Sequence, residues 1–393
     1  MGPVRNVLTM TSYLVLPEGV VLRQLETPVV YDCRTDTLYE IDEEAFRFLH
    51  ECAEKGVSQG EPRDTEFVGY CLEEGLLQEQ AEQPPKRRVD IRKAPLPSLR
   101  YLELQITNRC NLRCRHCYLG PARPVDLSLA QVREALEQFV RIQGLRLLVS
   151  GGEPLLHPMF REVNGLLRGV GVRVVLLSNG TLIDEHVARN LTAQEVQVSL
   201  DGMRDGHEIL RGTGSFDRVM AAIRYLIEAG KTVSVATMVH TGNVGEFDEM
   251  AALLPELGVS EWAVDAPCDL GALWENRELM LPPEEAGRFL SYGFGGSLHE
   301  GGEGALCGSH LMTITPEGLG CKCGYYSDRP LGRLEEGLDL LWSRLPKPGI
   351  DSLSCACPHL ETCRGGCRFR AERAGDPCGP DPVKCGQFGV ARG

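Results

Sequence analysis

Three cysteines lie within eight residues of one another in the segment ITNRCNLRCRHCYLG, residues 106–120. Cys110, Cys114 and Cys117 have C-x3-C-x2-C spacing. A structural zinc site closes its coordination with four ligands, and a disulfide framework needs an even number of cysteines. Three cysteines therefore predict a metal centre with one position left for another ligand.

Small and polar residues follow the next strand-like runs. SGGEP (150–154) and SNGT (178–181) each come directly after an apolar run. In parallel α/β folds, reactive groups gather in the loops after the carboxyl ends of the strands. Glycines there allow the backbone to approach a ligand closely, a carboxylate accepts from an ammonium group, and hydroxyls and amides suit a ribose. The candidate ligand-binding residues are Gly151, Gly152, Glu153, Ser178, Asn179, Ser199 and Thr237.

The elements that must position these residues alternate between strands and helices from residue 100 to 268. One helical pattern begins after Ser128 and ends before Gly144. Near-continuous apolar strands separated by helices indicate a parallel sheet covered on its outer face. Six units fit here, whereas a closed eight-stranded barrel typically needs about 250 residues. The sequence predicts an α/β fold with a partial (β/α)6 barrel over 98–270, with strands at 101–107, 145–150, 172–178, 195–200, 232–239 and 260–266.

The cysteine trio and the GGEP motif together resemble the signature of the radical S-adenosylmethionine (SAM) superfamily, over about residues 100–265. The resemblance implies a [4Fe–4S] cluster on the trio, with its open iron chelated by the methionine part of SAM. One electron would cleave SAM to methionine and a 5′-deoxyadenosyl radical, which abstracts hydrogen from a substrate. A zinc site that recruits a distant fourth cysteine is the alternative.

The same resemblance implies roles for single residues. Glu153 would lie near the SAM amino group, with the ribose lined by Ser178, Asn179 and Ser199. Arg211, in HEILRG, would pair with the SAM carboxylate, and a plain surface ion pair is the alternative for it. His207, one turn earlier, is expected to be structural.

Ten of the sixteen cysteines fall after residue 265, in a stretch with little periodicity. Their spacing, including Cys357-x5-Cys363-x3-Cys367, resembles the SPASM extension, expected here over 271–393, which holds two auxiliary iron–sulfur clusters. The family opens its second group with C-x2-C, but Ser354 stands in the first place and Cys355 follows it. The resemblance implies one cluster on Cys307, Cys323 and Cys367, with Cys268 or Cys321 as a possible fourth ligand, and another on Cys355, Cys357, Cys363 and Cys385.

A count of the tail cysteines is consistent with two clusters. Two clusters with four thiolates each need eight cysteines, and the region from Cys268 onward offers ten. Cys321 and Cys378 are the expected spares. A zinc-ribbon tail is the alternative, because C-x-C and C-x3-C pairs also suit zinc.

The segment before residue 82 reads as a small α+β unit. Four short strand-like runs precede a helix that Asp42 caps, and a second helix runs from about Thr65 to Gly75. Cys52 and Cys71 are expected in its core. Residues 1–81 resemble PqqD-like peptide-recognition domains, which take up a leader peptide as an added strand, and a structural cap is the alternative. EQPPKRRVDIRKAPLP (82–97), with four prolines, is predicted to be a linker.

Composition restricts the possible partners and the compartment. The formal net charge of −14 argues against a nucleic-acid surface. No apolar run approaches the ~18 residues of a membrane span, and the N-terminus lacks a signal peptide. We therefore expect a cytoplasmic protein, in a compartment that keeps thiols reduced.

The interpretation is a radical SAM/SPASM enzyme that modifies a ribosomally made peptide with electrons from a flavodoxin or ferredoxin-type reductant. LRLLVSGGEPLLH and EWAVDAPC resemble the subgroup associated with Y-X(10)-GDL precursor peptides. Asp265 and Cys268 are candidate catalytic residues at the mouth, with a structural role as the alternative for Asp265. The other functions considered are a haem-pathway tetrapyrrole side-chain enzyme, an iron–sulfur electron carrier and a zinc-stabilised binding protein.

Overall fold

The computed structural model describes residues 12–58, 64–296 and 306–390. The chain divides into two compact units, Met1–Leu96 and Pro97–Gly393. The N-terminal ten residues, where no targeting segment is expected, lie outside the described residues. Among the helices of the described ranges, none is long and apolar enough to cross a membrane.

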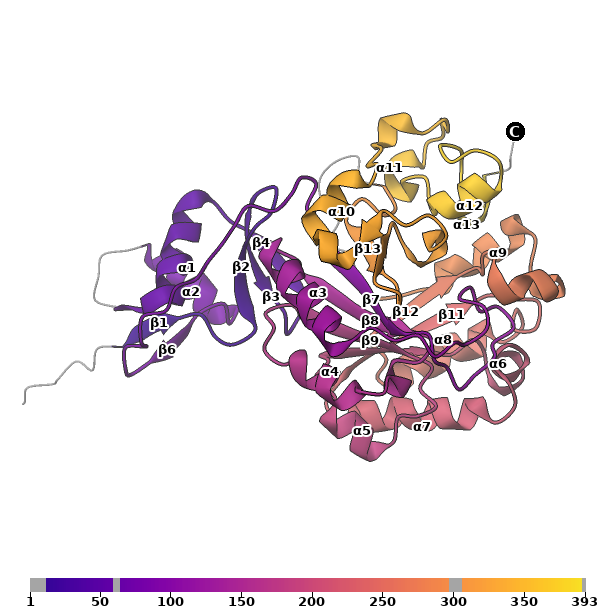
Figure 1. The fold of residues 1–393 in the computed structure, drawn as a ribbon, viewed down its shortest axis with the longest axis horizontal. Helices are drawn as coiled ribbons and strands as arrows, with labels where there is room; N and C mark the ends of the chain where they lie inside the picture. Colours follow the sequence, from indigo (N-terminus) through magenta and orange to yellow (C-terminus); the bar gives the residue numbers. More distant parts are fainter. Residues whose placement is uncertain (1–11, 59–63, 297–305, 391–393) are drawn as a thin grey trace, which may run out of the picture. The chain divides into compact units, whose positions relative to one another are not determined.

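Six parallel strands in chain order form the centre of the larger unit (Figure 1). Each strand pairs in parallel with the next one along the chain. The predicted partial (β/α)6 barrel is confirmed, and each predicted strand agrees with the observed one to within one residue at either end. The strands are β7 (Tyr101–Thr107), β8 (Arg146–Gly151), β9 (Arg173–Ser178), β10 (Glu195–Ser199), β11 (Thr232–Met238) and β12 (Glu261–Asp265).

Helices connect these strands and cover the outer face of the sheet (Figure 1). The side chain of Ser128 accepts from the backbone of Gln131 and caps the first of these helices, as predicted. A Cβ at Gly144 would lie 2.3 Å from the ring of Phe139, so only glycine fits where the chain turns into β8. The helices are α3 (Leu129–Arg141), α4 (Phe160–Leu166), α5 (Glu185–Asn190), α6 (Arg204–Arg211), α7 (Ser215–Glu228) and α8 (Phe247–Glu256).

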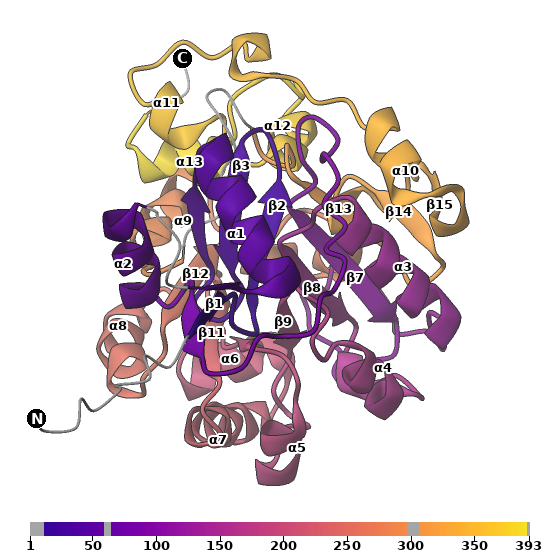
Figure 2. The ribbon, with the colours of Figure 1, turned by 90° about the vertical axis from the view of Figure 1, so that its left-hand side faces the viewer.

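The tail continues the barrel sheet. β13 (Leu311–Ile314) pairs in parallel with β7, and β14 (Leu319–Cys321) and β15 (Gly332–Arg333) follow in antiparallel order. Leu341 and Trp342 of α10 (Leu338–Arg344) belong to the barrel core. The cysteine-rich end lies around short helices that gather on one side of this unit in both views (Figure 2). They are α11 (Leu360–Cys363), α12 (Arg368–Arg373) and α13 (Pro382–Gln387), and α9 (Pro283–Phe289) precedes them.

The N-terminal unit contains two small sheets. β2 (Val20–Gln24), β3 (Pro28–Asp32) and β4 (Thr37–Glu40) form an antiparallel meander. β1 (Tyr13–Val15) lies between two strands that the sequence did not predict, β5 (Val57–Ser58) and β6 (Gln78–Gln80). The two predicted helices are α1 (Glu43–Lys55) and α2 (Thr65–Glu73).

Side chains from the helices fill the core of this unit. Asp42 caps α1 by accepting from Ala45 N at 2.8 Å. Cys52 and Cys71 are both buried in the core, as expected.

The proline-rich stretch from residue 82 packs against the N-terminal unit. Arg87 N donates to the carbonyl of Glu54 at 2.8 Å. Val89 and Ile91 pack against the core of this unit. Part of the stretch predicted to be a linker therefore packs on this unit, and the boundary between the two units falls after Leu96.

Candidate active site

A cavity of about 1090 Å³ lies at the carboxyl ends of the barrel strands. Its wall is formed by loops that follow different strands and therefore come from distant parts of the sequence. The fold thus brings together eleven predicted or motif residues at one mouth. They are Cys110, Cys114, His116, Cys117, Gly151, Gly152, Ser178, Asn179, Ser199, Arg211 and Cys268.

The two glycines of the GGEP motif serve the chain's own backbone. Gly151 has a φ of +140°, and a Cβ there would lie 2.2 Å from the carbonyl oxygen of Thr107. A Cβ at Gly152 would lie 2.4 Å from the carbonyl oxygen of Arg109. Glycine is therefore required because the loop after β8 rests directly on the segment that leads into Cys110.

Glu153 is fully buried behind the cavity wall. Its carboxylate accepts from Asn179 N at 2.8 Å, from Ser178 Oγ at 2.9 Å and from Leu155 N at 3.3 Å. Burial raises the pKa of Glu153 to about 7, and these donors oppose the rise. The side chain therefore ties the loop after β8 to the loop after β9.

Hydrogen-bond donors surround the sulfur of Cys110. Leu112 N donates to Cys110 Sγ at 3.5 Å, and Asn179 Nδ2 lies 3.9 Å from the same sulfur. Asn179 Nδ2 also donates to Asn111 Oδ1 at 3.0 Å, which fixes the amide beside the cysteine loop. Donors aimed at a cysteine sulfur are one of the means by which proteins tune iron–sulfur clusters.

Arg211 lies beside the cysteine trio and is paired with a buried acid. Its Nη1 is 3.8 Å from Cys114 Sγ, and its Nε donates to Asp201. Burial would raise the pKa of Asp201, but Arg211 and nearby histidines lower it to about 2. The side chains of Arg211 and Asp201 are only 10% and 1% exposed, so this is no surface ion pair.

Burial also acts on the thiols of Cys114 and Cys110. It raises the pKa of Cys114 to about 11, although the charge of Arg211 opposes the rise. Burial likewise raises the pKa of Cys110. A metal must therefore displace protons from these thiols when it binds.

Three histidines around Asp201 were not assigned to the site from the sequence. Burial lowers the pKa of His116 and of His207 to about 4, so both rings are neutral at pH 7. His207 Nδ1 accepts from Asp201 N at 3.1 Å, which is a structural role, as expected. His240 Nδ1 accepts from Gly242 N at 3.1 Å. Of the three, only His116 lines the cavity, and its place inside the cysteine motif was the available signal.

Besides Glu153, two further residues predicted at the mouth do not line the cavity. Thr237 donates to the carbonyl of Leu200 and accepts from Trp262 Nε1 at 2.8 Å, so its hydroxyl is already bonded to neighbouring segments of the chain. Asp265 accepts from Arg370 Nη1 at 2.5 Å, in line with the structural alternative.

One group of tail cysteines lies close to the barrel mouth. Cys268, Cys323 and Cys367 pack in one cluster with Tyr326 and Phe369. Contacts of the Cys268 and Cys307 thiols with Cys367 raise the pKa of the first two and lower that of Cys367. Cys321 is buried in β14, where its thiol points to the carbonyl of Leu319 at 3.9 Å. We name Cys268, Cys307, Cys323 and Cys367 the first auxiliary group.

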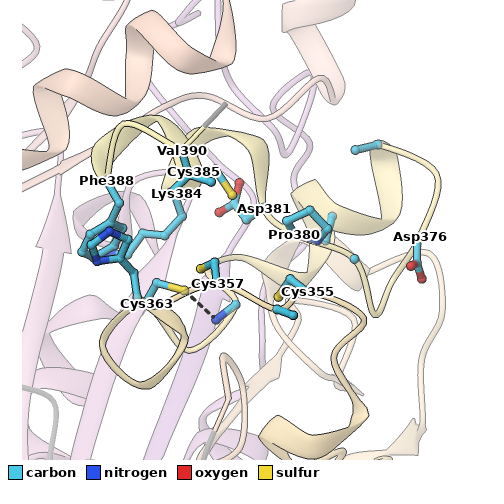
Figure 3. A pocket seen from close by; sticks show the side chains of 16 residues that line it. Cys355, Cys357, Cys363, Asp376, Pro380, Asp381, Lys384, Cys385, Phe388 and Val390 are labelled. Atoms are coloured by element: carbon cyan, nitrogen blue, oxygen red, sulfur yellow. Dashed lines mark hydrogen bonds between the residues drawn. The ribbon is translucent and has the colours of Figure 1, made fainter. Parts of the chain in front are cut away.

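A second group of tail cysteines surrounds a cavity of about 410 Å³ (Figure 3). Ser354 is not among the residues that line it, and its hydroxyl donates to Asp376 Oδ2 at 2.9 Å. Gly365 N donates to Cys363 Sγ at 3.3 Å (Figure 3). Cys378 is not among the lining residues. We name the four lining cysteines, Cys355, Cys357, Cys363 and Cys385, the second auxiliary group.

Among the described residues, no group of three His, Cys, Asp or Glu side chains is arranged to hold a single metal ion. The backbone donors to Cys110 and Cys363 fit the thiolate ligands of an iron–sulfur cluster.

A parallel (β/α)6 barrel with three cysteines at its mouth is the arrangement expected of the class of SAM-cleaving iron–sulfur enzymes. Residues 104–254 match the Radical SAM superfamily. The mycofactocin maturase MftC of Mycobacterium ulcerans (strain Agy99) is 30% identical over 322 residues, which cover 72% of this chain and 86% of that protein. The chain therefore belongs to the radical SAM superfamily.

Two further comparisons extend this finding. The AdoMet-dependent heme synthase of Oleidesulfovibrio alaskensis is 29% identical, but over only 43% of this chain and 45% of that protein. Streptococcus suis SuiB, in its crystal structure bound to precursor peptide SuiA, has a TM-score of 0.67 at 15% identity. That match covers 95% of this chain and 99% of that one, and it shows a shared fold.

Proposed function

We propose that this chain is a radical SAM enzyme that modifies a ribosomally made peptide by hydrogen abstraction. The observation that carries the proposal is the single cavity in which the cysteine trio meets the loops after β8, β9 and β10. The similarity to a mycofactocin maturase over most of the chain supports a peptide as the substrate. The fold shared with a precursor-peptide complex supports it as well.

Cys110, Cys114 and Cys117 would hold a [4Fe–4S] cluster, which we call the radical cluster. Together with SAM this cluster supplies a 5′-deoxyadenosyl radical. Asn179 orders the loop around Cys110, and Arg211 places a positive charge beside Cys114, where the SAM carboxylate is expected.

The Glu153 carboxylate has little hydrogen-bonding capacity left for the expected contact with the SAM amino group. A carboxylate offers about four lone-pair sites, and three donors of the chain already use the Glu153 carboxylate. Its main contribution is therefore to fix the two loops that frame the cofactor, with at most one site left for an ammonium group.

The two auxiliary groups would hold one iron–sulfur cluster each. Cys268 is the better fourth ligand for the first cluster, because it packs with Cys323 and Cys367 whereas Cys321 is buried in β14. Cys355 takes the place that Ser354 leaves in the second group. A flavodoxin or ferredoxin-type protein would supply the electron for SAM cleavage, in the cytoplasm, where thiols stay reduced.

The N-terminal unit would bind the leader of the substrate peptide. β4 is the last strand of the antiparallel meander, and among the described residues it pairs with β3 alone. An edge of this kind can accept an added strand through main-chain hydrogen bonds. The domain assignment thus becomes leader recognition by residues 1–96, radical chemistry in the barrel, and electron transfer in the SPASM-like tail.

The test is peptide modification. Anaerobically reconstituted enzyme, SAM and dithionite are incubated with each short peptide encoded beside this gene, and the products are weighed by mass spectrometry. The proposal expects a mass change in one peptide together with 5′-deoxyadenosine. If no such peptide changes and a tetrapyrrole with propionate side chains is altered instead, the relatives among the heme synthases indicate the function.

A further inference from the structure

A partly buried ion network connects the two auxiliary groups to the end of the barrel, with Asp265 43% exposed and Asp381 fully buried. Its centre is Arg370 of α12, whose side chain is only 10% exposed. Arg370 lies between two carboxylates, that of Asp265 at the end of β12 and that of Asp381 before α13. None of these three residues is a predicted metal ligand, and the proposed chemistry does not use their charges.

Asp381 connects Arg370 to the backbone around the cysteines. It is fully buried and accepts from Arg370 Nη2 at 2.8 Å and from Arg370 Nε at 2.9 Å. Its Oδ2 also accepts from Cys367 N at 2.8 Å, and its Oδ1 accepts from Val383 N at 3.1 Å. One carboxylate therefore orients Cys367 and the start of α13, the helix that carries Cys385.

The other side of the guanidinium reaches the barrel. Arg370 Nη1 donates to Asp265 Oδ1 at 2.5 Å and to the carbonyl of Ala266 at 3.4 Å. Cys268 follows two residues later in the chain. The same side chain therefore fixes the segments that carry Cys268 and Cys367, two members of the first auxiliary group.

A buried positive charge at this place also has an electrostatic consequence. Reduction adds an electron to a cluster, and the potential depends on nearby charge, hydrogen bonds and solvent exposure. Without Arg370, the fully buried Asp381 carboxylate beside Cys367 N would lose its positive partner, and charges interact strongly where water is excluded.

We propose that Arg370 is a positioning residue that holds the ligand segments of both auxiliary groups and raises the reduction potential of the first auxiliary cluster. The inference rests on the proposed auxiliary clusters and adds to them the residue that sets their electrochemistry. Arg370 touches neither substrate nor SAM in this account.

The experiment is an EPR-monitored redox titration of the reconstituted holoenzyme with Arg370→Gln. The signal of the radical cluster is recognised by its change on addition of SAM, and Cys367→Ser identifies the signal of the first auxiliary cluster. Arg373→Gln is the matched control, because Arg373 lies on the same helix but is 47% exposed and pairs with Asp269 at 3.6 Å.

We expect R370Q to lower the ratio of reduced to oxidised first cluster at least tenfold at a fixed potential. For one electron this is a shift of about 59 mV to more negative values. R370K keeps the positive charge but loses the planar guanidinium. The reduction potential of its first auxiliary cluster should therefore shift less than that of R370Q. A shift in R370Q no larger than that in R373Q overturns the inference.

Iron content separates the remaining outcomes. If R370Q binds less iron and R370K binds the full amount, the charge is needed for the cluster and the inference stands. If R370Q and R370K both lose iron while R373Q keeps it, the guanidinium of Arg370 serves folding only, and the electrochemical role is wrong. Wild-type protein without auxiliary clusters overturns the proposed function too, whereas wild-type protein with both clusters and no R370Q shift overturns this inference alone.

Discussion

At the scale of single residues, two buried carboxylates near the cysteine trio have opposite pKa shifts. Glu153 accepts from neutral donors, and burial raises its pKa to about 7. Asp201 is equally buried, but its pairing with Arg211 contributes to a pKa of about 2. The kind of partner therefore decides which of the two is ionised at neutral pH.

The raised pKa of Glu153 predicts a pH dependence of stability. A carboxyl group whose pKa is higher in the folded state stabilises the fold below its unfolded pKa of about 4.5, and this contribution is lost as pH rises through 7. A shift of this size corresponds to about 3 kcal/mol. Urea unfolding of the metal-free protein between pH 4.5 and 7.5 should show this fall, and Glu153→Gln should lack it. An equal fall in both proteins would contradict the assigned pKa.

The pair of Asp201 with Arg211 predicts a large difference between two aspartates near the same helix. Asp201→Asn leaves the Arg211 charge buried without its partner, which should cost about 3–5 kcal/mol of unfolding free energy. Asp217→Asn is the control, because it breaks an ion pair with Arg204 in which both side chains are more than half exposed. Denaturant unfolding of both variants decides the matter, and similar stabilities would show that Arg211 finds another partner.

At the scale of elements, long periodic patterns were predictable and short ones were not. The six barrel strands are apolar runs with little ambiguity, so both their order and their bounds follow from the sequence. β13 has four residues, and its partner β7 lies two hundred residues earlier in the chain, so no local pattern indicated that the sheet continues. β5 and β6 have two and three residues and gave no signal either.

Strand alternation explains why one ligand-binding candidate, Thr237, does not reach the cavity. Ala236 and Met238 of β11 line the cavity, so Thr237 between them faces the opposite side of the sheet. The choice between Cys268 and Cys321 as the fourth ligand of the first auxiliary cluster also required the structure, because separation along the chain does not show which cysteines lie close together. The cysteine trio and its loops were predictable because spacing within one loop fixes their neighbourhood.

The N-terminal unit yields a prediction at this scale. Deleting residues 1–96 should leave SAM cleavage intact, because every residue that lines the large cavity comes after residue 97. Peptide modification should fall sharply, since a strand added to β4 would lose several main-chain bonds worth about 1 kcal/mol each. Supplying the deleted unit in trans should restore part of the turnover. Full modification by the truncated enzyme would rule out a recognition role, and insoluble protein would favour a structural cap.

At the scale of the whole molecule, three cysteine groups predict the iron content. Reconstituted protein should hold about twelve irons if all three clusters have four irons each. Cys268→Ser should weaken or remove the first auxiliary cluster, whereas Cys321→Ser, in which the altered side chain stays buried in β14, should not. Iron analysis and absorbance measure both. Zinc in place of iron, or an effect confined to Cys321→Ser, would contradict the assignment.

The most direct test of the central claim is SAM cleavage in the absence of the trio. With Cys110, Cys114 and Cys117 all replaced by Ala, dithionite-driven formation of 5′-deoxyadenosine should disappear. The absorbance of the auxiliary clusters should remain, because clusters with four cysteine ligands have no open iron for SAM. Continued formation of 5′-deoxyadenosine by the triple variant would show that the cofactor is cleaved elsewhere and that the cavity described above is not the active site.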